Sequence, residues 1–590
     1  MRQLAKKFLV LGLAAGMAFS GACAAGEAGK YVLEQGVHYT DTIEWANDNF
    51  ADYDSALFGY NNGLAGAPDP SILKVEDPES ELYGQYLLFG TTGANAGFQC
   101  YYSDDLVNWR DRYQVFRPNP NSWSEANTSV SRDYWAPECI WDKDTGLYYL
   151  FFSARNTRLL SHRGTARTLS VAVSENPDGP YYEYAEYLLR KECAKEGREP
   201  TSSEIASALY LPWFSSEEML KAEQKRFPDA ITDEMTKTWG FSGIDPHPYV
   251  DPISGNKYLY LVADFNQATG THSWIYVMEM IDWVTPKYET LTQLTSHDGM
   301  GYEKTDNTIN EGPQMLYNAN NGKYYLQFST GSYGDSSYNV GIAIGDTPMG
   351  PFTKLSKEEG GLFISSLGST IVSGPGHHYI INVGDRMFAV YHRHRDPIVG
   401  GGSRVACIDE VVWVKNNDGL DVLHLNGCST TLTFAPISEY KNIAPEAKIT
   451  ASEGENVAML TDNVIATQTY ETWIKEYQFS SDSTRIKFDF DEYRSIAGIM
   501  IFNSLYYDTS FEIIQEIELE CMTESGRKYR AYIKDLMFNP EFLVDNKVVP
   551  ASAAIAAFND VLVKSVTIKV ERLYQNQETI AIGEIYILGK

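Results

Sequence analysis

The sequence contains an internal repeat, which limits the possible folds more than any other feature does. Five short runs of aromatic and β-branched residues follow Gly or polar turns, which is the pattern of a β-strand. The markers of these runs are separated by 63, 111, 65 and 63 residues. Such units are typical of four-stranded propeller blades, whereas an array of β-sandwiches needs about 100 residues per unit. We therefore expect an all-β chain with a five-bladed β-propeller. The markers are Tyr86, Tyr149, Tyr260, Tyr325 and Phe388.

The long second interval has an identifiable source between residues 184 and 240. There, Glu, Lys and Ala recur at helical spacing, over Tyr184–Glu196 and Ser215–Phe227. This pattern predicts a helical insertion in the second unit. The remaining sequence still repeats, because Asn176–Tyr181 and Thr347–Phe352 share the pattern Pro-x-Gly-Pro-aromatic.

The aromatic repeat ends near Phe434, and the rest of the chain has a different pattern. We expect the propeller to occupy residues 30–440 and a β-sandwich of the jelly-roll type to occupy residues 441–590. The predicted strands alternate apolar and polar residues. They are Thr484–Phe490, Ile496–Phe502, Ile513–Cys521 and Val561–Val570.

Residues 1–29 have the pattern of an export signal. A basic segment precedes a short apolar run over Phe8–Phe19, and small residues follow. These small residues precede Cys23, as in the processing sites of bacterial lipoproteins. We therefore expect a secreted or cell-surface protein, and a lipid anchor at Cys23 and free release are both open.

Charge and cysteine content exclude some classes of function. The formal net charge of −30 and the lack of a basic stripe argue against nucleic acid as a partner. No CxxC, GxSxG, HExxH or phosphate-loop motif is present, so no organic cofactor is expected. Cys407 and Cys428 could form a disulfide or remain buried free thiols.

Each repeat carries a polar side chain next to Pro or Gly, shortly before its marker strand. The innermost strand of a propeller blade lines the axial channel, so we expect these side chains to converge. Converging carboxylates repel one another, and such groups usually serve chemistry or metal binding. Two carboxylates that flank a sugar acetal can act as general acid and general base. The five positions are Asp69, Glu138, Asp245, Glu311 and His377.

The motifs around these positions resemble glycoside hydrolase family 43, between about residues 65 and 435. The resemblance implies a five-bladed propeller that hydrolyses arabinose-, xylose- or galactose-containing glycans with inversion. It implies that Asp69 is the general base and Glu311 the general acid. Asp245 would orient Glu311 and raise its pKa. The motifs are Ala-Pro-Asp69-Pro, Tyr-Trp135-Ala-Pro-Glu, Gly-Ile-Asp245-Pro-His, Asn-Glu311-Gly-Pro and Gly-Pro-Gly-His377.

The same resemblance implies roles for further residues. Trp135 would form a wall of the sugar pocket, and Arg404 would contact the sugar. His377 would hold a structural calcium ion near the propeller axis. With Glu138, these three residues form the expected substrate-binding set. The neighbouring motif His392-Arg-His could bind metal or simply end a polar strand.

Two other readings remain open for the chain. A surface glycan-binding lipoprotein without catalysis is the main alternative, although a binding protein has no need to keep Asp69, Asp245 and Glu311 together. A sugar transferase on a related propeller is another. The segments Asn442–Ser452 and Leu460–Asp462 resemble the opening of discoidin-like sandwiches, so carbohydrate binding and a purely structural role are both open for the C-terminal region.

Overall fold

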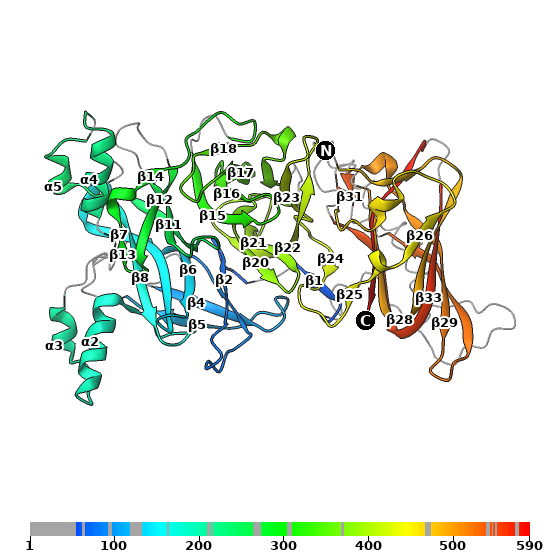
Figure 1. The fold of residues 1–590 in the computed structure, drawn as a ribbon, viewed down its shortest axis with the longest axis horizontal. Coiled ribbons are helices and arrows are strands. Elements are labelled where there is room, and N and C mark those ends of the chain that lie inside the picture. Colours follow the sequence, from blue (N-terminus) through cyan, green and yellow to red (C-terminus); the bar gives the residue numbers. More distant parts are fainter. Residues whose placement is uncertain are drawn as a thin grey trace, which may run out of the picture.

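The computed structural model shows an elongated all-β molecule, with helices at one end, a propeller in the middle and a second β-region at the other end (Figure 1). Five antiparallel sheets form the blades, which confirms the expected five-bladed propeller. The structure describes residues 55–590 except 62–64, 93–96, 119–132, 162–163, 209–213, 215, 230, 264–272, 304–308, 367–370, 466–473, 505, 539–542, 545–546, 549–550 and 573–576.

The first strand of each blade lies innermost. These inner strands contact one another in chain order, and the fifth also contacts the first, so the ring is closed. Blades one and two consist of β2 (Ser71–Lys74), β3 (Tyr86–Phe89), β4 (Phe98–Ser103), β5 (Arg110–Phe116), β6 (Trp135–Asp142), β7 (Leu147–Ser161), β8 (Gly164–Ser174) and β9 (Tyr182–Glu183). Blade three consists of β10 (Gly243–Val250), β11 (Lys257–Ala263), β12 (Trp274–Asp282), β13 (Thr285–Pro286) and β14 (Thr292–Gln293). Blades four and five consist of β15 (Asn310–Asn318), β16 (Lys323–Thr330), β17 (Asn339–Gly345), β18 (Phe352–Lys354), β19 (Leu362–Ile364), β20 (Gly376–Val383), β21 (Arg386–His394), β22 (Arg404–Lys415) and β23 (Asp421–Leu425).

The aromatic marker runs form the second strand of each blade, and their side chains fill the spaces between neighbouring blades. Blade one closes on blade five because Tyr86 and Leu88 share an apolar cluster with Phe388 and Val390. A strand pair reinforces this end of the propeller. In it, β1 (Phe58–Tyr60) pairs with β24 (Leu432–Phe434).

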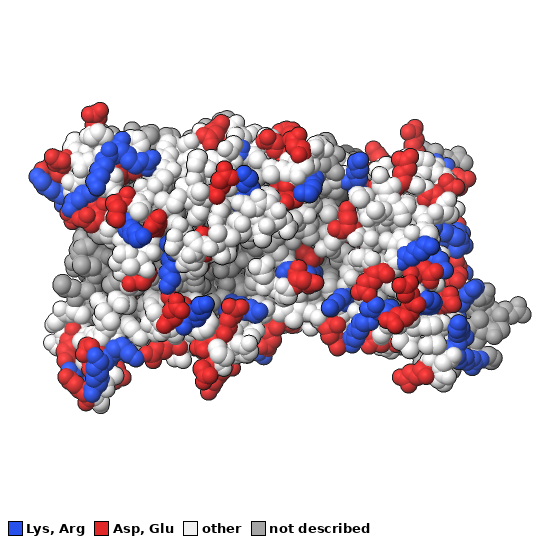
Figure 2. Space-filling model, in the orientation of Figure 1, with Lys and Arg blue, Asp and Glu red and all other residues white. Residues whose placement is uncertain are grey.

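Four helices lie between blades two and three, where the sequence predicts an insertion. On α4, Met219 and Leu220 pack in one apolar cluster with Trp283 of blade three, so this part of the insertion is anchored. Basic and acidic side chains are interspersed over the helices (Figure 2), as in the Arg190–Glu186 ion pair. None of the described helices is long and apolar enough to cross a membrane. The helices are α2 (Tyr184–Lys195), α3 (Ser202–Ser207), α4 (Ser216–Arg226) and α5 (Met235–Thr238).

The C-terminal strands form a sheet that folds over its own core. The long strand β28 shifts register between Asp489 and Arg494, and residues from both of its halves, such as Phe488 and Ile499, are buried in the same cluster. This arrangement fits the expected β-sandwich. The sheet contains β25 (Lys441–Asn442), β26 (Lys448–Ala451), β27 (Tyr477–Phe479), β28 (Ser483–Asn503), β29 (Ile513–Met522), β30 (Lys528–Met537), β33 (Ala553–Glu571) and β34 (Ile580–Gly589), and β31 (Leu543–Val544) pairs separately with β32 (Lys547–Val548).

The sandwich packs on the propeller through strands that are buried on both faces. In β28, Ile499 faces the sandwich core, whereas Met500 and Phe502 join a cluster that contains Phe434 of the propeller. The expected alternation over Ile496–Phe502 is therefore wrong. Both faces of this strand meet apolar surfaces, so the run is continuously hydrophobic.

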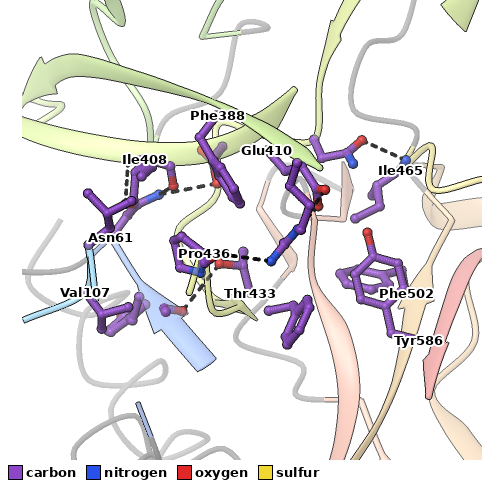
Figure 3. Close-up of a pocket in the computed structure, with 17 residues that line it drawn as sticks. Asn61, Val107, Phe388, Ile408, Glu410, Thr433, Pro436, Ile465, Phe502 and Tyr586 are labelled. Atoms are coloured by element: carbon purple, nitrogen blue, oxygen red, sulfur yellow. Dashed lines mark hydrogen bonds and ion pairs between the residues drawn. The ribbon is translucent and has the colours of Figure 1, made fainter. Parts of the chain in front are cut away.

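Polar contacts complete this interface. Asn426 of the propeller donates to the carbonyl of Asn463 at 3.0 Å and accepts from the backbone N–H of Ile465 at 2.9 Å. A pocket lies at the interface, where Glu410 of blade five and Tyr586 of the sandwich face the same space (Figure 3).

The described cysteines are all buried free thiols, which is one of the two states that the sequence leaves open for Cys407 and Cys428. The expected export signal and Cys23 lie outside the described residues.

Candidate active site

An irregularity at the start of the inner strands brings the predicted site residues together. The register of β10 shifts between Ile244 and His247, and the other inner strands from blade two onward shift at the matching place. Such bulges re-aim side chains next to active sites. In every blade one residue there has a positive φ, a conformation that costs roughly 1–3 kcal/mol for a residue other than Gly. These residues are Asp69, Ala136, Asp245, Gly312 and His377.

The bulges change how the blades align. Ala136, rather than Glu138, occupies the position that Asp69, Asp245 and His377 occupy in their blades. In blade four Gly312 takes this position, and Glu311 precedes it. Glycine relieves crowding there, because an added Cβ would lie 3.1 Å from Nδ1 of His377. The functional side chains therefore come from two adjacent positions of the bulge rather than from one.

Most of the predicted site residues line one open pocket of about 550 Å³ at the propeller axis. Three carboxylates from blades one, three and four share this pocket with aromatic, imidazole and guanidinium groups. Polar groups that converge in a largely apolar hollow are typical of a ligand site. The lining residues are Asp69, Thr91, Trp135, Ile244, Asp245, Glu311, Tyr333, His377 and Arg404.

Asp69 is held as an anion by its surroundings. Arg404 Nη1 donates to Oδ1 at 2.6 Å, and the Thr91 hydroxyl donates to Oδ2 at 2.6 Å. Burial alone would raise the pKa of Asp69, but the charge of Arg404, aided by the Thr91 hydrogen bond, lowers it well below its usual range. His377 and His392 contribute less to this lowering at neutral pH. Burial lowers their own pKa values, so both imidazoles are neutral there.

Glu311 is held by a phenol. Tyr338 donates to Oε1 of Glu311 at 2.7 Å, and its pKa is raised by burial and by the charges of Glu311, Asp69 and Asp245. Asp245 is fixed beside the same residue, because its Oδ2 accepts from the backbone N–H of Gly312 at 3.0 Å. The structure therefore places Asp245 next to Glu311 through the backbone of Gly312, whereas Asp69 is paired with the Arg404 guanidinium.

A ring stack links these two carboxylates. The Tyr338 and His392 rings are nearly parallel, with centroids 5.5 Å apart. His392 Nδ1 accepts from the backbone N–H of Asp69 at 3.1 Å, and its Nε2 lies 3.4 Å from Arg404 Nη1. His394 is also engaged, since Nε2 lies 2.7 Å from the Tyr333 carbonyl and Nδ1 lies 3.0 Å from the Ser373 hydroxyl. The second interpretation of the His-x-His motif, a polar strand end, therefore agrees with these contacts.

Glu138 is the one predicted site residue that does not line this pocket. It lines a smaller cavity that shares Asp69, Asp245 and His377 with the pocket, and its Oε1 is 2.8 Å from Nδ1 of His247. The Nε2 of His247 accepts from the backbone N–H of Met315 at 3.2 Å, so Nδ1 carries the proton and donates to Glu138. Burial raises the pKa of Glu138, and His247 opposes this effect.

Calcium prefers six to eight oxygen ligands. His377 offers one imidazole near the axis, and it lies 3.5 Å from Asp69 Oδ1. Among the described residues, no group of three or more His, Cys, Asp and Glu side chains is placed to hold a metal ion. The donor set therefore does not fit a calcium ion held mainly by these side chains, and calcium at His377 stays a prediction.

Two aromatic side chains contribute to the pocket wall. Trp135 comes from blade two, and the Arg167 guanidinium lies 4.3 Å from its ring centroid. Tyr333 comes from blade four, is 52% exposed, and has Arg404 5.1 Å from its ring centroid. Exposed aromatic rings in a pocket offer surfaces for sugar rings.

Sequence reasoning missed Thr91, Tyr333 and Tyr338. Thr91 follows the marker strand of blade one, and the two tyrosines lie in the connection between β16 and β17. These residues lie outside the inner strands, so the repeat frame contains no signal for them.

Carboxylates from three blades in one axial pocket are suited to acid–base cleavage of a glycosidic bond, and comparison with known proteins supports this class of enzyme. The family model "Glycosyl hydrolases family 43" matches residues 64–218 and 219–419. The chain belongs to this family and is a glycoside hydrolase.

Individual relatives differ in their named activities. A β-D-galactofuranosidase of Aspergillus niger is 23% identical over 365 residues, which cover 59% of this chain and 82% of the relative. An extracellular endo-α-(1→5)-L-arabinanase of Thermotoga petrophila is 27% identical over 325 residues, covering 52% of this chain and 54% of the relative. A crystal structure of a thermostable family-43 glycoside hydrolase is 26% identical, with a TM-score of 0.46, and covers 64% of this chain and 100% of that one.

Proposed function

We propose that this protein is an inverting glycosidase that acts on arabinose-, xylose- or galactose-containing glycans. The observation that carries the proposal is the difference between two carboxylates in one pocket. Asp69 is paired with a guanidinium, and Glu311 is held by a phenol beside Asp245. Titratable groups in contrasting environments are how one site supplies both an acid and a base.

The proposed reaction uses the two carboxylates on opposite sides of the sugar. Asp69, as general base, takes a proton from a water molecule that attacks the anomeric carbon. Glu311, as general acid, gives its proton to the glycosidic oxygen, and the bond from that oxygen to the anomeric carbon breaks. Asp245 keeps a negative charge near Glu311, which favours its protonated form. The base needs room for the water, and an inverting pair is therefore about 6.5–9.5 Å apart.

Arg404 and the aromatic walls have binding roles in this proposal. Arg404 is close to both Asp69 and the half-exposed Tyr333 ring, so it can share its donors between the base and a sugar hydroxyl. Trp135 packs against the sugar from the other side. His377, with its neutral imidazole, completes the pocket near the base.

The substrate sugar and the stereochemistry are tested together. The purified protein is incubated with nitrophenyl arabinofuranosides, xylosides and galactosides, and the fresh product is followed by proton NMR before mutarotation. We expect hydrolysis of one of these classes with inversion of the anomeric configuration. A product of unchanged configuration would contradict the roles of Asp69 and Glu311, and inactivity on every sugar with intact glycan binding would favour the binding-protein alternative.

Export is part of the proposal. Two relatives are named as extracellular arabinanases, and residues 1–29 have the pattern of an export signal. A Cys23→Ser variant distinguishes the two modes of export. Release of this variant into the medium, with the unaltered protein retained in membranes, is expected for a lipid anchor.

A further inference from the structure

One hairpin of the propeller has an unusual charge pattern. Strands β7 and β8 of blade two extend beyond the pairing of Arg155 with Arg167, as far as the pairing of Ser161 with Gly164. Residues 145–174 contain four Arg, one His and no Asp, Glu or Lys, in a chain whose net charge is −30. A local excess of basic residues in an acidic protein indicates attraction to an anionic group.

Contacts at the base of the hairpin show where this charge lies. Arg155 Nη2 is 2.8 Å and Arg167 Nη2 is 3.3 Å from Oδ2 of Asp133. Asp133 is buried, whereas the side chains of Arg155 and Arg167 remain 29% and 18% exposed. Two guanidinium groups thus share one carboxylate, and the three side chains together carry a net positive charge.

This cluster adjoins the catalytic pocket. Arg167 lies 4.3 Å from the ring centroid of Trp135, and Trp135 lines the pocket. Stacking on an indole fixes the plane of a guanidinium, and a fixed guanidinium binds a planar carboxylate with two parallel hydrogen bonds. The cation therefore stands beside the sugar that packs on Trp135.

The rest of the pocket excludes an anion from its centre. Asp69, Asp245 and Glu311 surround that space, and Arg404 is already paired with Asp69. An acidic group on the substrate would be repelled there and attracted to the blade-two rim, where Arg155 and Arg167 lie. The charges of the pocket thus favour a substrate with its carboxylate at one defined edge.

We propose that the natural substrate carries a uronic acid next to the cleaved linkage, and that Arg167, supported by Arg155, binds its carboxylate. This inference rests on the proposed glycosidase function and makes its substrate class specific. The neutral part of the glycan occupies the pocket, and the carboxylate lies over the base of the β7–β8 hairpin.

The test compares substrates that differ only in charge. The probes are glucuronic acid linked to xylobiose and galacturonic acid linked to arabinobiose, each as the free acid and as the methyl ester. Dissociation constants are measured by calorimetry, and kcat/KM is measured at low salt and in 0.5 M NaCl. We expect one free acid to be preferred over its ester by roughly tenfold, with the preference reduced at high salt.

Matched variants locate the effect. Arg167→Gln is expected to remove the preference, Arg167→Lys to keep part of it, and Arg155→Gln to weaken it. Arg190→Gln is the control, because Arg190 also lies over an aromatic ring, at 4.0 Å from the Tyr182 centroid, and pairs with Glu186, yet it lies on α2 and does not line the pocket. This control is expected to keep the full preference.

The outcomes separate the inference from the proposed function. Equal binding of acid and ester by the unaltered protein overturns the inference, and so does a preference that survives in both Arg167→Gln and Arg155→Gln. If Arg167→Gln does not fold, Arg155→Gln decides. Hydrolysis of the neutral nitrophenyl glycosides tests the proposed function independently, since the calorimetric comparison needs no turnover.

Discussion

The inner strands of the propeller and the long strands of the sandwich differ in their length and in the side chains that they bring together. The inner strands are four to nine residues long, and those of blades two to five are bulged. Asp69, Asp245 and His377, at or just before the starts of these strands, have positive φ. The sandwich strands β28 and β33 are long and pair over most of their length, with apolar residues in continuous clusters. Converging charge is thus concentrated at the axis, and continuous apolar packing at the other end.

The axial residues therefore serve chemistry, whereas the apolar residues of the sandwich serve stability. Converging carboxylates lower stability, so their presence at the axis indicates function. The sandwich instead supplies apolar area, some of it directly to the propeller through Phe502 and Tyr586. The two regions should therefore respond differently to mutation.

Removal of the sandwich should have the largest effect. A chain that ends at residue 440 would expose Leu432 and Phe434, which now pack against Phe502 and Leu588. We expect this fragment to be insoluble or to lose its cooperative thermal transition, because a large apolar patch promotes aggregation. Solubility, thermal unfolding and kcat are measured on the fragment and on the full chain. A soluble fragment with unchanged unfolding temperature and kcat would show that the interface is dispensable.

Substitution of the axial carboxylates should lower activity strongly in a protein that still folds. Glu311→Gln and Asp69→Asn are each expected to lower kcat by roughly 10²–10⁴-fold, the usual contribution of a general acid or base. Ile568→Ala in the sandwich core is the opposite control. It should lower the free energy of unfolding by about 2–5 kcal/mol and leave the kcat of folded protein unchanged. Near-normal turnover in either carboxylate variant would remove it from the mechanism.

Asp409 is buried in blade five, and its protonation links the stability of the fold to pH. Burial raises its pKa to about 6, despite hydrogen bonds from Ser429 and Tyr391. The folded state therefore holds this proton more tightly than the unfolded state, whose pKa is about 3.9, so stability falls as pH rises from about 4 to about 6, by about 2–3 kcal/mol. Asp409→Asn should remove this part of the pH dependence in denaturant titrations.

Asp251 is the matched control for Asp409. Asp251 has a lowered pKa, because hydrogen bonds from Ser254 and Tyr324 outweigh its burial. Its contribution has the opposite sign, since it is present above the unfolded pKa and is lost at lower pH. An unchanged pH profile in Asp409→Asn would contradict the raised pKa of Asp409.

The sequence predicts the blades well and the site only in part. The 64-residue repeat depends on strand patterns that each blade forms locally, so blade number and the convergence of Asp69, Asp245 and Glu311 could be predicted. The bulge that places Ala136 instead of Glu138 at the position equivalent to Asp69 depends on backbone conformation. The doubly buried run at Ile496–Phe502 depends on a partner surface elsewhere in the chain, so its role was not visible from alternation alone.

The smallest expected effect concerns Tyr338, which contacts the axial residue Glu311 but lies outside the repeated inner strands. Tyr338→Phe removes one hydrogen bond to Glu311 and keeps the ring stacked on His392. One such bond is worth about 1–1.5 kcal/mol, so we expect kcat to fall roughly tenfold, with KM little changed, because the phenol positions the acid rather than the sugar. Tyr324→Phe is the matched control, since its hydroxyl donates to Asp251 at 2.8 Å away from the pocket and its loss should affect stability alone. Steady-state kinetics across pH, with thermal unfolding of both variants, distinguishes the two. Equal kinetic effects of both substitutions would show that Tyr338 acts through general stability and that the chain of contacts from Asp69 to Glu311 has no catalytic role.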